Sequence, residues 1–182
     1  MEKLKYRMNL AAKKISESET IMTQMVMPND TNPMGKLMGG NLMRWMDIVC
    51  GICAGKHTNT SVVTASVDYV SFTLPIEVGD VVTMHAKVTR AFNSSVEIFV
   101  EVFAADIKGG NNRKCNDAYF TFVGVDKQAD GTIQPVKIPS VLPLTGEEQA
   151  KYDAALRRRE MRLVLAGRMK PTEAKNLKMI FD

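Results

Sequence analysis

The sequence contains few of the residues that bind metals or form disulfides. Only three of its 182 residues are cysteine and only two are histidine, whereas a structural zinc site uses about four such ligands at close, regular spacings. Cys50 and Cys53 form one CxxC pair, a motif that can be redox-active or metal-binding, but no second pair accompanies it. We therefore interpret the cysteines as small core residues in a reducing compartment and expect no metal site.

Long apolar runs are also absent. No stretch reaches the roughly 18 apolar residues that a membrane-spanning helix needs. The opening stretch, MEKLKYRMNLAAKK, lacks the apolar core and the small-residue cleavage site of a secretory signal. We expect a cytoplasmic chain with no membrane span.

The excess of positive charge lies at the two ends of the chain. The formal net charge is +4, of which residues 1–14 contribute +4, residues 147–182 contribute +3 and residues 15–146 contribute −3. A nucleic-acid-binding protein normally carries basic and aromatic side chains together on its folded body. The distribution therefore argues against a nucleic-acid partner, although a few well-placed cations could bind a phosphorylated small molecule.

Hydrophobic periodicity predicts one long helix among several strands. Apolar residues from Leu42 to Cys53 recur at spacings of three and four, which predicts a largely buried helix over residues 41–56. Alternating or β-branched runs predict strands elsewhere. These strands are expected over residues 19–27, 62–72, 81–91, 95–106 and 115–126.

The order of these elements predicts the fold class. Short connections between the strands favour antiparallel pairing, because parallel strands need long crossovers. One helix followed by consecutive strands therefore predicts an α+β fold, with a single antiparallel sheet wrapped around the helix. From Gly146 a charged, largely exposed helix follows, with Gly167 and Pro171 as its end signals. We divide the chain into a basic N-terminal segment (1–18), one domain (19–140) and a charged helical tail (141–182).

The strand predicted over residues 62–72 has two chemically different faces. Alternation along a strand places successive side chains on opposite sides of the sheet. The apolar set, expected to face the core, is Val63, Ala65, Val67 and Tyr69. The polar set, expected on the other side, is Thr64, Ser66 and Asp68.

A motif precedes and enters the predicted helix. The stretch PNDTNPMGKLMGGNLMRWMDIVCGICAGKH contains the pattern N-x-x-G-x-x-x-G-G-x-x-x-x-x-x-D, and SVVTASVDYVSF and P-x-x-V-G-D follow it. Together these motifs resemble the acyl-CoA thioesterases of the brain-acyl-CoA-hydrolase and YciA type, over roughly residues 20–140. The resemblance implies a hotdog fold, in which a curled antiparallel sheet wraps around one long central helix.

The resemblance also implies a reaction and an assembly. The reaction is hydrolysis of acyl-CoA to a fatty acid and CoA, with no cofactor apart from the CoA that is part of the substrate. The assembly is a homodimer in which each site spans two subunits, with three dimers forming a hexamer. The catalytic asparagine of the family falls on Asn32 and its catalytic aspartate on Asp47, which act from opposite subunits.

Further positions resemble those near the substrate in this family. Thr64, Ser66 and Asp68 lie on the strand that runs near the active-site helix in this family. A second group of positions lies near the nucleotide. A solvated sheet face and an ordinary loop explain the same residues equally well. The nucleotide positions are Asn93, Ser94, Ser95 and Lys114.

The residue types of the motif suit thioester hydrolysis. Asp47 can act as a general base for water, or attack the thioester itself to form an anhydride, and the sequence does not choose between these. An apolar helix face is expected to raise its basicity by partial desolvation. Asn32 can orient the water or donate to the carbonyl oxygen. Gly39 and Gly40 would let the thioester approach the backbone amides of the helix N-terminus closely.

Each of these residues also has an ordinary structural explanation. Asp47 could lie where the helix reaches the surface, the two glycines could form a loop-to-helix hinge, and Asn32 is a common turn residue. Within the fold, a hydratase or dehydratase acting on CoA- or carrier-bound acyl chains is a second reading, although neither His57 nor His85 has a recognisable partner. A non-catalytic acyl-CoA-binding regulatory module is a third. The sequence leaves open the acyl chain length, the role of the tail and the oligomer size beyond the dimer.

Overall fold

A computed structural model describes residues 10–178 as two compact units, divided between Val141 and Leu142. We call residues 10–141 the sheet unit and residues 142–178 the C-terminal unit. Residues 1–9 of the predicted basic segment lie outside the described residues. The rest of that segment contains β1 (Lys13–Lys14) and a short 3-10 helix, η1 (Ile15–Glu17).

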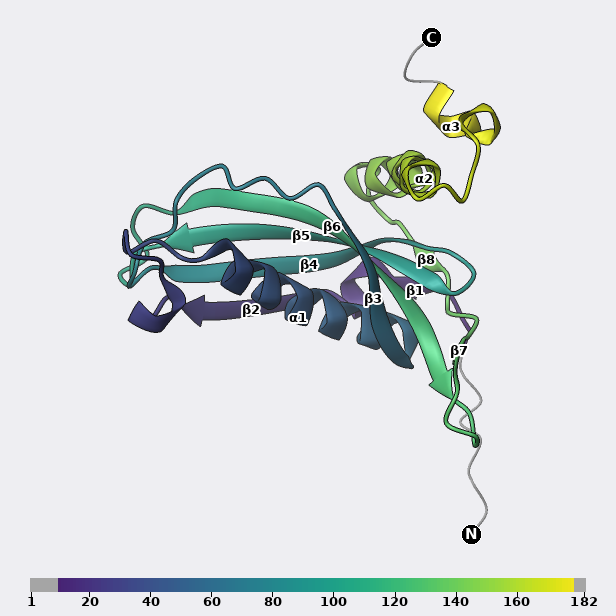
Figure 1. Ribbon diagram of the computed structural model, residues 1–182, viewed down its shortest axis with the longest axis horizontal. Helices are drawn as coiled ribbons and strands as arrows, with labels where there is room; N and C mark the ends of the chain where they lie inside the picture. Colours follow the sequence, from purple (N-terminus) through teal and green to yellow (C-terminus); the bar gives the residue numbers. More distant parts are fainter. Residues whose placement is uncertain (1–9, 179–182) are drawn as a thin grey trace. The chain divides into compact units, whose positions relative to one another are not determined.

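The sheet unit is built on a six-stranded antiparallel sheet and one long helix (Figure 1). The helix, α1 (Gly39–Thr58), lies along one face of the sheet. In the described chain the strands follow the spatial order β2-β4-β5-β6-β3, and β7 pairs with the end of β6. This confirms the predicted α+β hotdog fold, a curled antiparallel sheet around one central helix. The strands are β2 (Thr20–Met25), β3 (Ser61–Asp68), β4 (Val81–Ala91), β5 (Ser95–Ala105), β6 (Arg113–Lys127) and β7 (Ile133–Pro135).

The core forms between α1 and the sheet because each has an apolar face. Along β4, alternate residues from Val82 to Val88 are buried, as the period of a strand requires. β5 is buried along most of its length, because its outward side chains also have contacts: Glu97 with Thr89 of β4, and Phe99 with Tyr119 of β6. Removing this apolar surface from water contributes about 25 cal/mol per Å² to folding. The buried apolar residues of the helix are Leu42, Trp45, Met46, Val49, Cys50, Cys53 and Ala54.

The edge strand β3 differs from its prediction in the direction of its side chains. A β-bulge shifts its register with β6 between Thr64 and Ser66. Thr64 pairs with Phe122, whose ring packs under α1, whereas Ser66 pairs with Thr121 on the opposite face. The extra residue of the bulge therefore turns the strand, so that Thr64 faces the helix and Ser66 faces away. The predicted polar face shared by Thr64, Ser66 and Asp68 is wrong.

The apolar side chains of the same segment are exposed instead of buried. Val63 is 44% exposed, Val67 36% and Tyr69 85%. The alternation of apolar and polar residues predicted that these side chains face the core. The same alternation occurs in edge strands and in inner strands, so it did not indicate that β3 lies at an edge. In the described chain β3 has a neighbour on one side alone, so nothing covers this surface.

The strand β8 (Val141–Leu142) spans the boundary between the two units, and the C-terminal unit that follows is mainly helical. α2 (Gly146–Leu165) starts with a capping box formed by Thr145 and Glu148, which confirms the predicted charged helix. The carboxylate of Glu160 accepts hydrogen bonds from the N–H groups of Asn176 (2.7 Å) and Leu177 (3.1 Å), which fixes the following segment on α2. That segment contains the 3-10 helix η3 (Pro171–Glu173) and α3 (Lys175–Lys178). Within residues 10–178, none of the helices has the length and apolarity needed to cross a membrane.

His57 fixes the end of α1 in the core of the sheet unit. Its side chain is fully buried, with Nε2 3.1 Å from the Pro139 carbonyl oxygen and Nδ1 3.4 Å from the Ser18 hydroxyl. A carbonyl can only accept, so Nε2 carries a proton and donates to Pro139. Burial lowers the pKa of His57 below its ordinary value of 6.5. The residue is therefore a structural contact of the helix end.

We predict that His57 makes the protein less stable in mild acid. Because the pKa of His57 is lower in the folded than in the unfolded chain, the unfolded chain binds more protons between the two values. The free energy of unfolding should fall as the pH drops from about 6.5 towards the folded pKa, and stay reduced below it. Urea unfolding at a series of pH values measures this loss.

The matched pair of variants is His57→Gln and His85→Gln. His57→Gln should lower stability at neutral pH and flatten the dependence between pH 7 and 5, because no proton is taken up at that position on unfolding. His85 lies on β4, outside the contacts that hold the end of α1, and His85→Gln is the control for replacing a histidine elsewhere in the sheet unit. Equal slopes in wild type and His57→Gln would contradict the prediction.

Candidate active site

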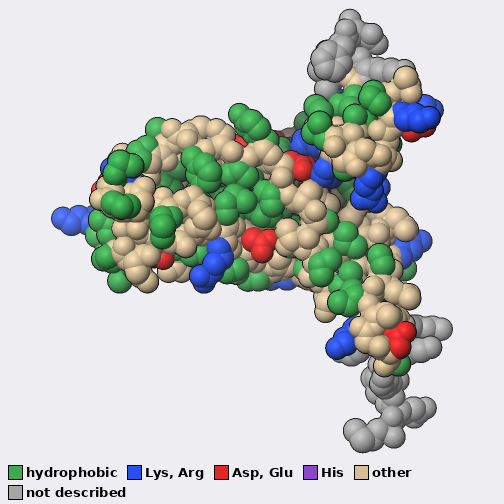
Figure 2. Space-filling view, viewed as in Figure 1, with side chains coloured by type: hydrophobic (Ala, Val, Ile, Leu, Met, Phe, Trp, Pro, Cys, Tyr) green, Lys and Arg blue, Asp and Glu red, His purple; other side chains and the backbone are tan. Residues whose placement is uncertain are grey.

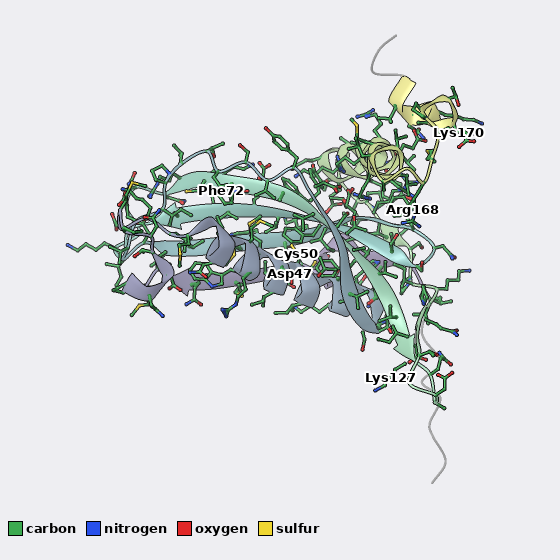
Figure 3. All side chains as sticks on the ribbon, viewed as in Figure 1. Asp47, Cys50, Phe72, Lys127, Arg168 and Lys170 are labelled. Carbon is green, nitrogen blue, oxygen red and sulfur yellow. The ribbon has the colours of Figure 1, made fainter. Side chains whose placement is uncertain are left out.

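Asp47 lies on α1 at the border between its buried face and a line of exposed residues. Asp47 is half-buried in the described chain. The apolar helix face expected from the sequence would have buried this residue more completely. The hydroxyl of Thr64 on β3 donates to Asp47 Oδ1 over 2.8 Å. The carboxylate is therefore held between the helix and the edge strand (Figure 3). The exposed line repeats every four residues: Gly40, Arg44, Ile48, Ile52 and Lys56.

Exposed apolar side chains lie on both elements that hold this carboxylate. Ile48 is 40% exposed, Ile52 is 45% exposed and Val67 on β3 is 36% exposed. An edge strand also leaves a row of backbone N–H and C=O groups without strand partners. Exposed apolar side chains beside an unpaired strand edge are typical of a site of association. The surface around Asp47 thus has the composition of an interface.

Asn32 lies in the loop before α1, where its side chain makes a turn. Its Oδ1 accepts hydrogen bonds from the N–H groups of Met34 (3.0 Å) and Lys36 (3.1 Å). These two bonds fix which side of the amide is oxygen, because only oxygen can accept. Among the described residues, no acceptor is hydrogen-bonded to Asn32 Nδ2. Asn32 is thus both a turn residue, as its type suggested, and an oriented amide donor.

Gly39 and Gly40 form the first turn of α1, two residues earlier than the predicted start. The N-cap residue is Met38, which makes no side-chain cap. Within the described chain the N–H groups of both glycines have no hydrogen-bond acceptor. They share the loop end of α1 with Asn32. The start of the helix therefore presents several backbone and side-chain donors at its positive end.

Asp47 is too far along α1 to work with these donors in the same chain. A rise of 1.5 Å per residue places it roughly 10 Å from Gly40 along the helix axis. Figure 3 shows Asp47 well separated from Phe72, whose ring packs on Gly39. The activating carboxylate and the hydrogen-bond donors must each lie within about 3 Å of the reacting atoms of one substrate. One chain therefore carries the two halves of the motif without joining them.

The residues predicted near CoA are spread over the sheet unit. Thr64 bonds to Asp47, while the Ser66 hydroxyl donates to Asp68 Oδ1 over 3.3 Å on the other face of β3. The segment 93–95 forms the connection into β5, where the carbonyl oxygens of Asn93 and Ser94 accept backbone hydrogen bonds and Ser95 is buried. The structure does not bring this segment to Lys114, because they lie towards opposite ends of β5.

The positive charge of Lys114 is balanced by two neighbouring carboxylates. Its ammonium lies 2.9 Å from a Glu101 carboxylate oxygen and 2.7 Å from an Asp117 oxygen. Burial lowers the pKa of Lys114, but its hydrogen bonds to Asp117 and Glu101 raise this pKa by more, so that it lies above the ordinary value. With two carboxylates beside one cation, the local charge does not favour a phosphate in this chain. The role of Lys114 at the nucleotide stays a prediction.

A pocket of about 410 Å³ opens beside the start of α1. One wall is the first turn of the helix, including Gly39 and Leu42, and another is the segment between β3 and β4. That segment has no strand structure and carries exposed apolar side chains. The pocket is lined mainly by Leu37, Leu42, Phe72, Leu74, Ile76 and Cys115.

The other reactive side chains lie apart from Asp47 or in the core. Cys50 and Cys53 are buried free thiols, which confirms their interpretation as core residues. Burial raises the pKa of Cys53 to about 12 and that of Cys50 well above its ordinary value. His85 packs edge-on against Phe103 on the sheet. Within residues 10–178 no three metal-binding side chains come together.

Comparison with known proteins identifies the family. Residues 34–110 match the family model of the Thioesterase superfamily. YkhA of Bacillus subtilis, an uncharacterized acyl-CoA thioester hydrolase, is 36% identical over 142 residues, which cover 78% of this chain and 80% of that protein. This chain belongs to the thioesterase superfamily. Mouse acyl-coenzyme A thioesterase 11 is 39% identical over 153 residues, 84% of this chain, but this chain spans only a quarter (25%) of that longer protein.

Solved structures of the superfamily share the fold. An acyl-CoA hydrolase from Bacillus cereus superposes with a TM-score of 0.78 at 31% identity, covering 93% of this chain and 98% of its own. A hexameric acyl-CoA thioesterase reaches 0.79 at 34% identity, covering 86% and 97%. An acyl-CoA hydrolase from Staphylococcus aureus, in complex with butyryl coenzyme A, coenzyme A and coenzyme A disulfide, reaches 0.76 at 32% identity, covering 94% and 99%.

The Staphylococcus aureus enzyme has also been solved with single residues replaced by alanine. One replaced residue is an asparagine, one an aspartate and one a threonine. In that chain the aspartate follows the asparagine by fifteen positions, and the threonine follows the aspartate by seventeen. Asn32, Asp47 and Thr64 have the same two spacings in this chain.

Sequence reasoning missed two features of the site. The first is the contact between Thr64 and Asp47, which arises from the register of β3 on β6 and leaves no local signal. The second is the pocket wall formed by Phe72 and Leu74. A signal for it was present, since apolar residues persist in a turn segment where polar ones are usual.

The two glycines at the start of α1 should differ in their response to a side chain. A Cβ on Gly40 would meet no atom within 4 Å, so Gly40→Ala should stabilise the protein by about 0.4–1 kcal/mol through the entropy of the unfolded chain. A Cβ on Gly39 would lie 3.1 Å from the Phe72 ring, so Gly39→Ala should gain less or lose stability. Urea unfolding of both variants measures the difference. The opposite ranking would be incompatible with the packing of Phe72 on Gly39.

Proposed function

We propose that this protein hydrolyses acyl-CoA thioesters to a fatty acid and CoA, in sites that each combine two copies of the chain. The observation that carries the proposal is the placement of the motif's two halves. Thr64 holds the Asp47 carboxylate at an apolar edge, and the unpaired donors lie roughly 10 Å away along α1. A second chain that covers this edge can supply the donors that Asp47 lacks in its own chain.

Asp47 activates the attacking group. Its Oδ1 accepts from Thr64, which leaves Oδ2 to accept a proton from water. As a general base, Asp47 takes this proton while the water oxygen bonds to the thioester carbon and the carbonyl π electrons move to oxygen. The carbonyl then re-forms, the C–S bond breaks, and the CoA thiolate takes the proton from Asp47. Direct attack by Oδ2 on the thioester carbon instead breaks the C–S bond, expels the CoA thiolate and leaves an anhydride. Water then cleaves the anhydride to the fatty acid and the Asp47 carboxylate, and the proton released goes to the thiolate.

The other half of the site stabilises the developing oxyanion. The N–H groups of Gly39 and Gly40 and the Nδ2 group of Asn32 lie at one end of α1 and need no rearrangement to donate. Because Asn32 is fixed by two backbone bonds, its amide is oriented before substrate arrives. One such donor contributes about 10²–10³ to the rate.

Similar proteins support this assignment. The Staphylococcus aureus hydrolase binds butyryl coenzyme A and coenzyme A, and the residues replaced in it share the spacing of Asn32, Asp47 and Thr64. We therefore extend the role of Thr64 from a CoA contact to a positioning residue for Asp47. The two histidines of this chain bond or pack elsewhere, so the pairing of an acid with a histidine that a hydratase would use has no counterpart at Asp47.

The minimal assembly we propose is a homodimer across β3 and α1. The edge strand and the exposed side chains of Ile48, Ile52 and Val67 would be covered in it. Two similar thioesterases are hexameric, which supports three such dimers as the complete assembly. The free, buried cysteines are consistent with the cytoplasm as its location.

The first test is release of free thiol from acyl-CoAs. Asp47→Ala should lose about 10²–10⁴ in turnover, because the general base or nucleophile is gone. Asn32→Ala should lose about 10²–10³. Thr64→Val should lose about 10- to 100-fold, since a hydrogen bond to a charged group contributes about 1.5–3 kcal/mol.

The matched control is Asp126→Ala, which removes an exposed carboxylate at the far end of β6. It should retain wild-type turnover. Wild-type thiol release in Asp47→Ala, with an unchanged circular dichroism spectrum, would falsify the proposed chemistry.

The second test addresses the shared site. Equal mixing of Asp47→Ala and Asn32→Ala chains, with subunit exchange, gives half heterodimers by statistics. Each heterodimer has one intact site and one doubly damaged site, so the mixture should regain roughly a quarter of wild-type activity. Native mass spectrometry confirms the exchange. Heterodimers that form but regain no activity would place both residues in one chain.

A further inference from the structure

We infer that Phe72 limits the length of the acyl chain that the pocket beside Gly39 accepts. The inference rests on the proposed function, since it names the specificity of that same site. The pocket at the start of α1 has a volume of about 410 Å³, towards the lower end of the range of about 300–1,000 Å³ for small-molecule sites.

The lining of this pocket is suited to hydrocarbon. Most of its side chains are apolar, including Leu37, Leu42 and Ile76. Its polar members already have partners, because Lys36 is ion-paired with Glu77 and the Thr73 hydroxyl donates to the Cys115 carbonyl over 2.6 Å. A ligand group that enters therefore finds apolar contacts and few free hydrogen-bonding groups, which favours an alkyl chain over a polar substituent.

Gly39 connects the pocket to the proposed chemistry. Its backbone N–H is one of the unpaired donors at the helix start, and the same residue forms part of the pocket wall. A thioester whose carbonyl oxygen accepts from this turn has its reacting carbon beside the pocket. The apolar lining then favours entry of the acyl chain over entry of the polar CoA part. The pocket is therefore placed to take the acyl chain.

The Phe72 ring stands at the exposed side of this pocket. It is 56% exposed, and its ring lies 3.1 Å from the position of a Cβ on Gly39. Figure 3 places it on the outer part of the sheet unit, and Figure 2 shows hydrophobic side chains over the same end of that unit. A long acyl chain that fills the pocket must pass or displace this ring.

The segment that carries Phe72 is anchored directly after the ring. The backbone N–H of Thr73 donates to the Cys115 carbonyl over 3.3 Å, and the hydroxyl of the same residue donates to the same oxygen. These two bonds tie the segment to β6 at one point. The position of Phe72 is thus defined, although the segment forms no strand.

A boundary of this kind has a measurable consequence for chain length. Each methylene that enters an apolar pocket improves binding about fourfold. The gain stops at the length at which the chain reaches the wall. For wild type we expect kcat/KM to rise about fourfold per methylene and then level off or fall.

The experiment compares wild type with Phe72→Ala and Phe72→Trp over saturated acyl-CoAs from acetyl to palmitoyl. Phe72→Ala removes the ring and should move the plateau of kcat/KM to longer chains. Phe72→Trp enlarges it and should move the plateau to shorter chains. Phe72→Leu is the second, more conservative variant, with a shift in the same direction as Ala. Circular dichroism and urea unfolding confirm that each variant is folded.

The matched control is Tyr69→Ala. Tyr69 is an exposed aromatic residue three positions earlier in the same segment, and it does not line the pocket. Its variant should keep the wild-type plateau. A plateau at the same length in wild type, Phe72→Leu and Phe72→Trp would overturn the inference.

A binding series separates this inference from the proposed hydrolysis. S-alkyl-CoA thioethers of increasing length cannot be hydrolysed, and calorimetry measures their affinity relative to CoA alone. The inference is supported if affinity rises with chain length up to a limit that shifts in the Phe72 variants, even if no acyl-CoA is cleaved. In that case the lack of cleavage would overturn the proposed function alone. Affinities independent of chain length would overturn the inference, whatever the rate of thiol release.

Discussion

The rotational setting of α1 against the sheet is the constraint on which the site depends. One apolar stripe of the helix is buried on the strands, so the opposite residues must face outward. Asp47 falls at the border of these two regions, where it is sheltered but not enclosed. The same setting directs the first turn, with Gly39, towards the pocket. Helix packing thus determines how both halves of the motif are presented.

The β-bulge in β3 adds the second element of precision. If Ala65 were paired regularly with β6 instead of forming the bulge, the alternation of the strand would place Thr64 and Ser66 on one face. The bulge lets Thr64 reach Asp47 while Ser66 joins Asp68 on the other side. Bulges are common near functional sites because they redirect single side chains. A local irregularity in an edge strand therefore supplies the partner of the key carboxylate.

Sequence patterns predicted the parts of this structure that depend on local order. The periodicity of α1 and of β4 follows directly from the spacing of apolar residues, and both elements were found within two residues of their expected bounds. Asn32 and Asp47 entered as candidates through the resemblance, and the structure shows how each is held. The bulge, the exposure of Val63 and the packing of Phe72 on Gly39 depend on strand register and on neighbours distant in sequence. Alternation alone carries no information about which strand lies at an edge.

The distance along α1 has a consequence for a newly made chain. Under the proposed function, a single copy carries one activating carboxylate and one set of donors, and it cannot use them together. Catalysis would then begin only when two copies meet, so the fraction of competent protein depends on concentration by mass action. A nascent or isolated chain would leave the acyl-CoA pool of the cell untouched. The spacing of two residues on one helix would in this way make assembly the switch that starts hydrolysis.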